Sequence, residues 1–135
     1  MHDRQNDSYE LKLQKLCDGM LTKDASIRFV GVANHFGSLV TSSYRADLVP
    51  LMTNEETRQY ALEAVTRALM RETFQTKTGR LRYAIGVYEK LIRATLSIPS
   101  RDHDLYLLIS FDIGSDATAI IEKRMLPQFN DLQAF

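Results

Sequence analysis

The sequence predicts an α+β domain, with a five-stranded antiparallel sheet flanked by three helices in the order α-β-β-α-β-β-β-α. Apolar residues recur at helical spacing in three separate stretches, which predicts the helices. Between those stretches lie short runs rich in β-branched, aromatic and leucine residues, which predict strands. Short polar turns join consecutive strands, so the neighbours must be antiparallel.

The length and composition fit a single globular unit. A chain of 135 residues suits one domain, because domains of about 100–150 residues bury enough apolar surface to fold alone. Its hydrophobic share of 44% and charged share of 25% are typical of globular proteins rather than disordered ones. We therefore expect one domain over residues 1–135, with its ordered core at about residues 8–127.

The first expected helix covers roughly residues 7–21. One face carries apolar residues at helical spacing: Tyr9, Leu13, Leu16, Cys17 and Met20. A nucleophilic cysteine needs an accessible, polarised thiol beside a base. Because Cys17 lies on the apolar stripe instead, the sequence favours a packed structural thiol.

The stretch "IRFVGVANHFGSLVTSSYR" predicts the first hairpin of the sheet. Asn34 and Gly37 tolerate the positive φ angles of a tight turn, and His35 should lie exposed at its tip. Gly31 should let another backbone or a large side chain approach the strand. The glycines lack the G-x-G-x-x-G spacing of a phosphate-binding loop, so they should shape the backbone rather than hold a ligand.

A long second helix should follow the connector "YRADLVPLM". Thr53 and Glu56 form a capping box, so the helix should begin at Asn54 and run for roughly twenty residues. It should end at "TKTG", where Gly79 can adopt the left-handed conformation of a helix cap.

The remaining chain predicts three strands and a final helix. The strands are "RLRYAIGVYE", "LIRATLSI" and "LYLLISFDI", and the last should lie inside the sheet because it is apolar on both faces. In "GSDATAIIEKRMLP", Ser115 should cap the helix and Pro127 should stop it. Its apolar face should comprise Ala119, Ile120 and Met125 or Leu126.

The long helix has apolar residues on more than one side. A broad stripe should dock against the sheet, formed by Ala61, Leu62, Ala64, Val65, Ala68 and Leu69. Tyr60, Met70 and Phe74 fall outside that stripe. A neighbouring loop could cover them, they could be ordinary scattered exposed residues, or they could meet a partner helix.

The third strand is the candidate edge of the sheet. Tyr83, Ile85 and Val87 alternate with small or charged residues, as in a half-buried edge strand. A bare edge invites pairing with another strand.

Several classes of function find no support in the sequence. A formal net charge of zero disfavours nucleic-acid binding, and the single cysteine indicates a reducing compartment, most simply the cytoplasm. The polar first residues and the lack of a long apolar run argue against export or membrane insertion. His2, His35 and His103 lie outside any metal motif, and no nucleophile elbow or phosphate loop occurs. We assign no catalytic, cofactor-binding or metal-ligating residue.

Two motifs resemble a known family. The first hairpin follows the pattern I-R-x-x-x-V-A-x-x-x-G-x-L-V-x-S, carried by Ile27, Arg28, Val32, Ala33, Gly37, Leu39, Val40 and Ser42. Together with "LYLLISFDIGSDATAIIEKRML", it resembles the roadblock/dynein light-chain group, which is related to longin and profilin-like domains. The resemblance spans about residues 8–127. The chain also resembles small uncharacterised proteins of ammonia-oxidising archaea.

The resemblance implies a non-enzymatic, homodimeric interaction or regulatory module. Such domains typically pair their third strands across a two-fold axis, pack their long helices together, and serve small GTPases as platforms or regulators. Carried over by position, the interface would comprise Tyr60, Met70, Phe74, Leu81, Tyr83, Ile85 and Val87. The alternative is a small-ligand sensor, because profilin-like sheets can enclose a pocket beside the hairpin.

Overall fold

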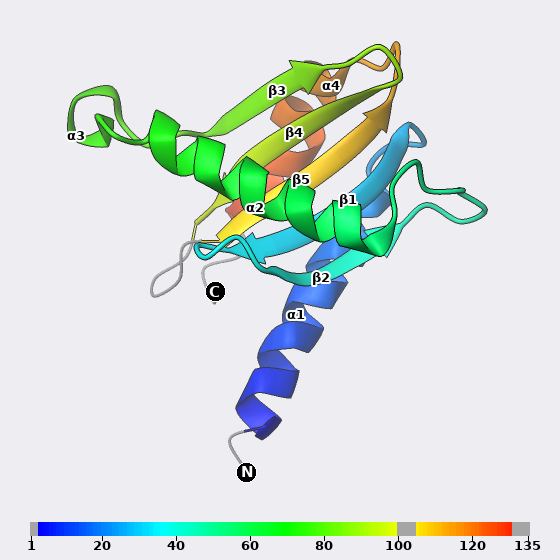
Figure 1. The fold of residues 1–135 in the computed structure, drawn as a ribbon, viewed down its shortest axis with the longest axis horizontal. Coiled ribbons are helices and arrows are strands. Elements are labelled where there is room, and N and C mark those ends of the chain that lie inside the picture. Colours follow the sequence, from blue (N-terminus) through cyan, green and yellow to red (C-terminus); the bar gives the residue numbers. More distant parts are fainter. Residues whose placement is uncertain (1–2, 100–104, 131–135) are drawn as a thin grey trace.

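The computed structural model describes residues 3–99 and 105–130, with side chains from residue 8 onward. Its centre is a five-stranded sheet in which every pair of neighbours is antiparallel, as the sequence predicts (Figure 1). The order across the sheet is β2 (Leu39–Tyr44), β1 (Ile27–Asn34), β5 (Leu105–Asp112), β4 (Leu91–Ile98) and β3 (Tyr83–Val87).

Helices cover both faces of this sheet (Figure 1). One face packs against α1 (Asp3–Leu21) and the C-terminal helical segment, and the other against α2 (Asn54–Arg71). The described part of the chain has more helical elements than the three expected. The additional ones are α3 (Gln75–Thr78) and the division of the last segment into α4 (Ala117–Ile120), the π-helix η1 (Ile121–Met125) and α5 (Leu126–Phe129).

Strand β5 occupies the centre of the sheet, as its continuous apolar run predicts. Residues 105–111 are all buried because β1 and β4 pair with its two edges and helices cover both of its faces. The prediction that a strand apolar on both sides lies inside a covered sheet is therefore confirmed.

The apolar face of α1 packs into the larger of two cores. Leu13, Leu16, Cys17 and Met20 are buried there, with Tyr9 at the border. Burial, reinforced by nearby Asp18, raises the pKa of Cys17 to about 12, so the thiol stays protonated at neutral pH. Cys17 is a packed structural residue, as the sequence favours.

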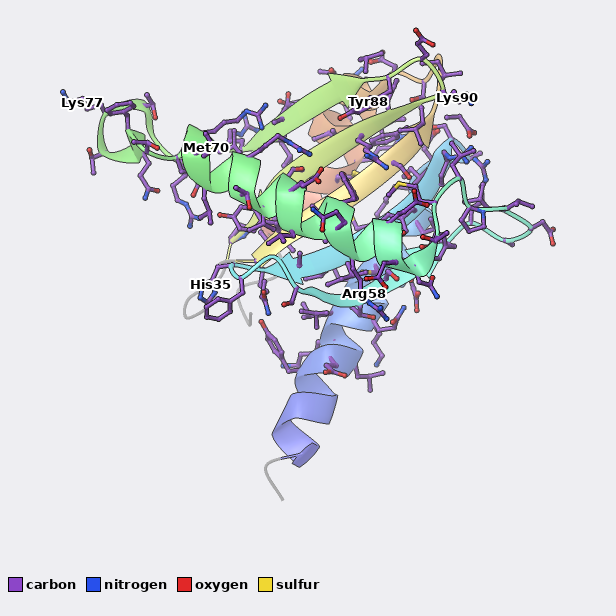
Figure 2. The ribbon with its side chains drawn as sticks, in the orientation of Figure 1. His35, Arg58, Met70, Lys77, Tyr88 and Lys90 are labelled. Carbon is purple, nitrogen blue, oxygen red and sulfur yellow. The ribbon has the colours of Figure 1, made fainter. Side chains whose placement is uncertain are left out.

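The first hairpin turns as expected. Gly37 has a φ of 81°, and the Asn34 Oδ1 atom accepts hydrogen bonds from the backbone N–H groups of Phe36 and Ser38. His35 lies exposed at the tip, directed away from the sheet (Figure 2). At Gly31, an added Cβ would lie 2.8 Å from the Phe29 Cζ atom. Gly31 therefore admits a large side chain, as predicted.

Helix α2 begins as predicted but ends earlier. Both hydrogen bonds of the Thr53–Glu56 capping box are present. The helix ends at Arg71, and Gly79, with a φ of 83°, ends the short α3 instead. The Thr73 hydroxyl donates to the Met70 carbonyl at 2.7 Å. Such side-chain bonds compete with helix continuation, a local effect that the apolar spacing does not reveal.

The C-terminal segment corrects two expectations. Asp116, rather than Ser115, caps it, because the Asp116 Oδ1 atom accepts from the Ala119 N–H at 3.2 Å. Pro127 does not stop the segment. It lies in the first turn of α5, directly after the π-helix, where a missing N–H costs little, and the segment continues to Phe129.

Candidate functional site

Helix α2 faces the sheet with most of the stripe that the sequence predicts, turned somewhat toward Tyr60. Its buried residues are Tyr60, Ala61, Ala64, Val65 and Ala68. Tyr60 was expected outside the core stripe and is only 7% exposed, whereas Leu62 and Leu69 were expected inside it and are 45% and 44% exposed. The buried side is therefore rotated toward Tyr60.

Two contacts set this rotation. The Arg93 guanidinium of β4 lies 3.9 Å from the centroid of the Tyr60 ring, which draws Tyr60 onto the sheet by a cation–π interaction. The tip of the first hairpin packs against the helix at Leu62, where a Cβ on Gly37 would lie 2.9 Å from the Leu62 Cα atom. Neither contact is visible in the spacing of apolar residues along α2.

Four apolar side chains on and just after α2 are exposed and are called the apolar strip here: Leu62, which lies beside the hairpin tip, Leu69, Met70 and Phe74. Met70 and Phe74 are 71% and 67% exposed. Figure 2 shows Met70 near the C-terminal end of α2 and Lys77 on α3, which projects beyond the sheet and has no buried residue. Of the three helix residues expected at an interface, Met70 and Phe74 are exposed and Tyr60 is not.

Strand β3 forms one edge of the sheet, as its alternation predicts. Leu81 was expected in this strand but precedes it, and its half-buried side chain packs against the core under α2. Tyr83 and Ile85 pack against the opposite core, and the Tyr83 hydroxyl donates to Glu122 at 2.6 Å. Val87 is 71% exposed. The expected interface side chains therefore do not form one continuous surface.

The backbone of β3 offers a different kind of contact. The Ser97 N–H donates to the Arg82 carbonyl, and the Tyr88 N–H donates to the Leu91 carbonyl. Hydrogen-bonded and non-bonded pairs alternate along an antiparallel ladder. With the observed register, the backbone groups of Tyr83, Ile85 and Val87 therefore point away from β4, toward the free edge.

The other edge of the sheet, β2, is tied to α1. The Gln14 Nε2 atom donates to the Ser42 carbonyl at 3.2 Å and to the Ser43 hydroxyl at 2.8 Å. The Thr41 hydroxyl donates to Gln14, and the Ser43 hydroxyl donates to Asp18. Side chains of α1 thus occupy polar groups along β2, and β3 is the more accessible edge.

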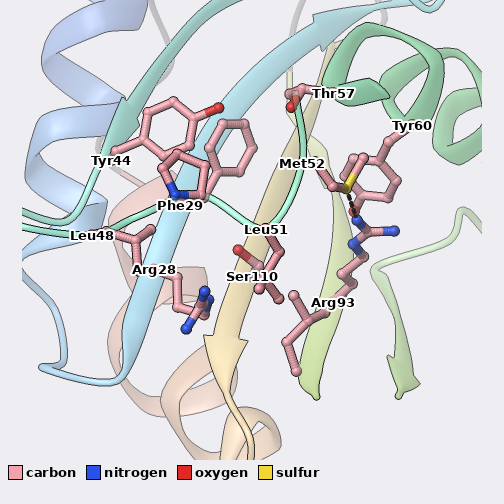
Figure 3. Close-up of a pocket in the computed structure, with 12 residues that line it drawn as sticks. Arg28, Phe29, Tyr44, Leu48, Leu51, Met52, Thr57, Tyr60, Arg93 and Ser110 are labelled. Carbon is pink, nitrogen blue, oxygen red and sulfur yellow. Dashed lines mark hydrogen bonds between the residues drawn. The ribbon is translucent and has the colours of Figure 1, made fainter. Parts of the chain in front are cut away.

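A cavity of about 50 Å³ lies on the α2 side of the sheet, beneath the connector of residues 45–53 (Figure 3). Its floor is one row of residues that are partners across neighbouring strands: Tyr44, Phe29, Ser110 and Arg93. Leu48 and Leu51 of the connector line the opposite side. We call this space the connector pocket.

The cations around this pocket differ in their partners. Arg45 and Arg28 both bond to Asp112, at 2.6 and 3.1 Å. The hydrogen bond from Arg45, assisted by Arg28, holds the pKa of Asp112 below its usual range. Arg93 contacts the Met52 sulfur and the rings of Tyr60 and Tyr88, but no carboxylate among the described residues.

The sequence does not predict the connector pocket. The available signal was Arg93, a charged residue in the middle of the apolar run "LIRATLSI". Its partners come from the connector, from α2 and from the end of the β3–β4 hairpin, so only the fold assembles them.

The described residues also bear on metal binding and membrane insertion. No group of three or more histidine, cysteine, aspartate or glutamate side chains is placed to hold a metal within residues 3–99 and 105–130. His2, His103 and the "RDHD" cluster lie outside the described residues. Within the described helices, none combines the length and apolarity that a membrane span requires.

Comparison with known proteins gives a match in structure only. No family model matches the sequence, and no curated protein matches it. Among solved structures, the Roadblock/LC7 domain from Streptomyces avermitilis superimposes with a TM-score of 0.68 at 10% identity, covering 89% of this chain and 93% of that one. The gliding protein MglB from Thermus thermophilus gives 0.67 at 10% identity, with 91% of each chain covered.

A third neighbour, MglC from Myxococcus xanthus, has a TM-score of 0.56 at 14% identity and covers 89% of this chain and 98% of that one. Identities this low establish likeness of fold, and the matches extend over nearly the full length of both chains. The chain therefore has a roadblock-like fold, as its sequence motifs imply.

Proposed function

We propose that the protein is a non-enzymatic, homodimeric interaction module that regulates or scaffolds a small GTPase. Two observations carry the proposal: the open edge of β3, and the exposed apolar side chains on and just after α2. The small GTPase is the partner that the roadblock-like fold implies. The cytoplasm remains the predicted compartment.

Pairing of two copies would begin at β3. Backbone groups of Tyr83, Ile85 and Val87 face the free edge, and unpaired edges of this kind readily accept another strand. A two-fold axis across this edge would join two sheets into one, with each strand presenting the same groups to its copy. These three residues would then contribute backbone hydrogen bonds rather than an apolar surface.

The apolar strip would supply the side-chain contacts. Methionine and aromatic residues are enriched at interface centres, and Met70 and Phe74 are more than two-thirds exposed. Helix α3 has only four residues, none of them buried, and helices this short gain stability mainly from packing. We therefore revise the interface to the strip, Val87 and the β3 backbone, and remove Tyr60.

The solved neighbours support association as a role of the fold. One of them is described as MglB with a tetrameric arrangement, which states that this relative in structure forms an assembly. The proposal transfers the capacity for self-association to this chain. It does not transfer the tetramer.

Two measurements test the proposal. Light scattering after size exclusion should give twice the monomer mass of 15.5 kDa at micromolar concentrations, and a monomer throughout the high micromolar range would refute dimerisation. Affinity capture from native lysate, loaded with GDP or with a non-hydrolysable GTP analogue, should retain a small GTPase. Retention of no GTPase with either nucleotide would refute the GTPase part of the proposal.

Ligand sensing is the second candidate function. The connector pocket is the observation that favours it, because a cavity lined by cationic and aromatic side chains can select a small molecule. An enzymatic role is disfavoured because the hydroxyl–carboxylate pairs of the described residues, such as Ser43–Asp18 and Ser26–Asp24, include no histidine to relay a proton.

A further inference from the structure

We propose that the connector pocket binds a small monocarboxylate of about two to three carbons, which its size and its donors would select. The carboxylate would be held by Arg93 and Ser110, and the alkyl part would lie against Phe29 and Leu51. This inference concerns a different surface from the dimer interface and does not depend on it.

The register of the sheet places the two polar groups side by side. Arg93 of β4 and Ser110 of β5 are direct partners, and Ser110 is also the partner of Phe29 of β1. Side chains of directly opposite residues leave the same face of a sheet with Cβ atoms about 4.5–5.5 Å apart. Figure 3 shows Arg28, Ser110 and Arg93 along this face, with Leu51 of the connector over them.

Arg93 lacks a counter-charge among the described residues. The acceptor nearest its guanidinium is the Met52 sulfur, which is a weak hydrogen-bond acceptor. The rings of Tyr60 and Tyr88, at 3.9 and 5.6 Å, enclose it without neutralising it. A half-buried guanidinium keeps a planar fork of donors that matches a carboxylate, and a ligand oxygen would readily displace the sulfur.

Tyr88 reaches Arg93 because Gly86 leaves room for it. A Cβ on Gly86 would lie 3.3 Å from the Tyr88 Cε2 atom. Gly86 is the strand partner of Arg93, so it continues the row of residues that forms the pocket floor. Because Gly86 has no side chain, the Tyr88 ring can lie over it. The two tyrosines thus fix the guanidinium plane before any ligand binds, which lowers the entropy lost on binding.

Ser110 supplies a second donor. The residue is 8% exposed and lines the pocket. Its hydroxyl is not one of the sealed, unpartnered side-chain atoms of the described core, so it can donate a hydrogen bond to a ligand in the pocket. A carboxylate oxygen between Ser110 and Arg93 would satisfy both groups.

The balance of charge beside the pocket also favours an anion. Arg28 and Arg45 share the single carboxylate of Asp112, and Arg93 adds a third cation. This local excess of positive charge occurs in a protein whose formal net charge is zero. The pocket therefore attracts anions, although the molecule as a whole does not.

Size and wall chemistry narrow the class of anion. A volume of about 50 Å³ corresponds to roughly four positions the size of a water molecule, which matches a carboxylate with one or two further carbons. Phe29, Leu48, Leu51 and Leu91 give the remaining wall an apolar character that inorganic phosphate would not use. A nucleotide is larger than this volume.

The test compares acetate, propionate, inorganic phosphate, hexanoate and neutral propionamide at constant ionic strength. Each is titrated into the wild-type protein, followed by backbone amide chemical shifts in NMR and by the melting temperature. Propionate or acetate should give saturable shifts that centre on Arg93 and Ser110, with a rise in melting temperature. Phosphate, hexanoate and propionamide should bind at least about 10-fold more weakly.

Variants decide whether the named groups hold the ligand. Arg93→Met and Ser110→Ala should weaken propionate binding by at least about 10-fold and about 3-fold, respectively. Arg58→Met removes an arginine whose side chain is 72% exposed on α2, and it should leave binding unchanged. Ser110→Ala removes only one atom from the core, so it remains informative if Arg93→Met fails to fold.

Three results would overturn the inference: no saturable shift with acetate or propionate, equal binding of propionamide or phosphate, or unaltered binding in Ser110→Ala together with Arg93→Met. Light scattering on the same samples reports dimerisation separately. Loss of one property with retention of the other therefore distinguishes failure of this inference from failure of the proposed function.

Discussion

The Arg93 guanidinium carbon lies 3.9 Å from the centroid of the Tyr60 ring, and this contact joins the middle of β4 to the buried side of α2. Burial raises the pKa of Tyr60 to about 12, although Arg93 acts against this rise, so the phenol is neutral at physiological pH. The contact explains why Tyr60 belongs to the core rather than to an interface.

Truncating Tyr60 should therefore affect folding more than association. We expect Tyr60→Ala to lower the free energy of unfolding by about 3–4 kcal/mol, as for other large aromatic residues removed from cores. Urea denaturation measures this loss. In a double-mutant cycle of Tyr60→Leu with Arg93→Met, a coupling energy below about 0.3 kcal/mol would show that the cation–π contact is not energetically significant.

Introducing charge into the apolar strip should weaken the dimer. Phe74→Asp and Met70→Asp place a carboxylate on side chains that are 67% and 71% exposed, so the monomer should keep its stability while self-association falls by at least about 10-fold. Sedimentation velocity over a concentration series measures this. Leu11→Asp is the matched control, because Leu11 is 55% exposed on α1 across the sheet from α2. Unchanged association in Phe74→Asp would remove that residue from the interface.

Strand pairing at β3 can be tested through one backbone donor. The Val87 N–H faces the free edge, and its side chain is 71% exposed, so Val87→Pro removes a donor without breaking the ladder to β4. We expect loss of the dimer with the monomer still folded. Val87→Thr keeps the donor and should dimerise normally. Hydrogen exchange offers a second readout: the amides of Tyr83, Ile85 and Val87 should gain protection as concentration rises.

Acid should destabilise the protein in part through Asp112. Its folded-state pKa is lowered, chiefly by the hydrogen bond from Arg45, so it contributes stability above its unfolded pKa of about 3.8. That contribution is lost as pH falls below about 4 and through the lower folded pKa. Urea unfolding at pH 7, 4 and 3 should show a shallower decline for Asp112→Asn than for the wild type.

Alanine substitutions at two glycines would distinguish the cost of backbone strain from the cost of steric overlap. Gly37 and Gly114 have φ values of 81° and 86°, but of these two only Gly37 is crowded, with a Cβ position 2.7 Å from the Leu62 Cδ1 atom. Gly114→Ala should cost about 1 kcal/mol from its φ angle alone. Gly37→Ala should cost about 2 kcal/mol or more, because the hairpin must also move away from α2. Equal losses in denaturation experiments would show that the Leu62 contact does not constrain the turn.

The sequence alone determined those features of the fold that depend on residues close together along the chain. The apolar run of β5 required a central strand, the Thr53–Glu56 pair started α2, and the Asn34–Gly37 turn closed the first hairpin. Each follows from local periodicity, capping or backbone freedom, and these act over a few residues of chain. The roadblock-like motifs, which combine such signals, indicated the correct fold.

Only the tertiary structure decided which surfaces are free. Tyr60 is buried and Leu62 is exposed, and the contact that distinguishes them is made by Arg93. Arg93 lies about thirty residues further along the chain and meets α2 only when the sheet has formed, so local spacing does not reveal this contact. The connector pocket has the same origin, since strand register aligns Phe29, Ser110 and Arg93 from three separate strands. Burial and charge pairing between distant segments depend on packing geometry, which the spacing of residues within one segment does not specify.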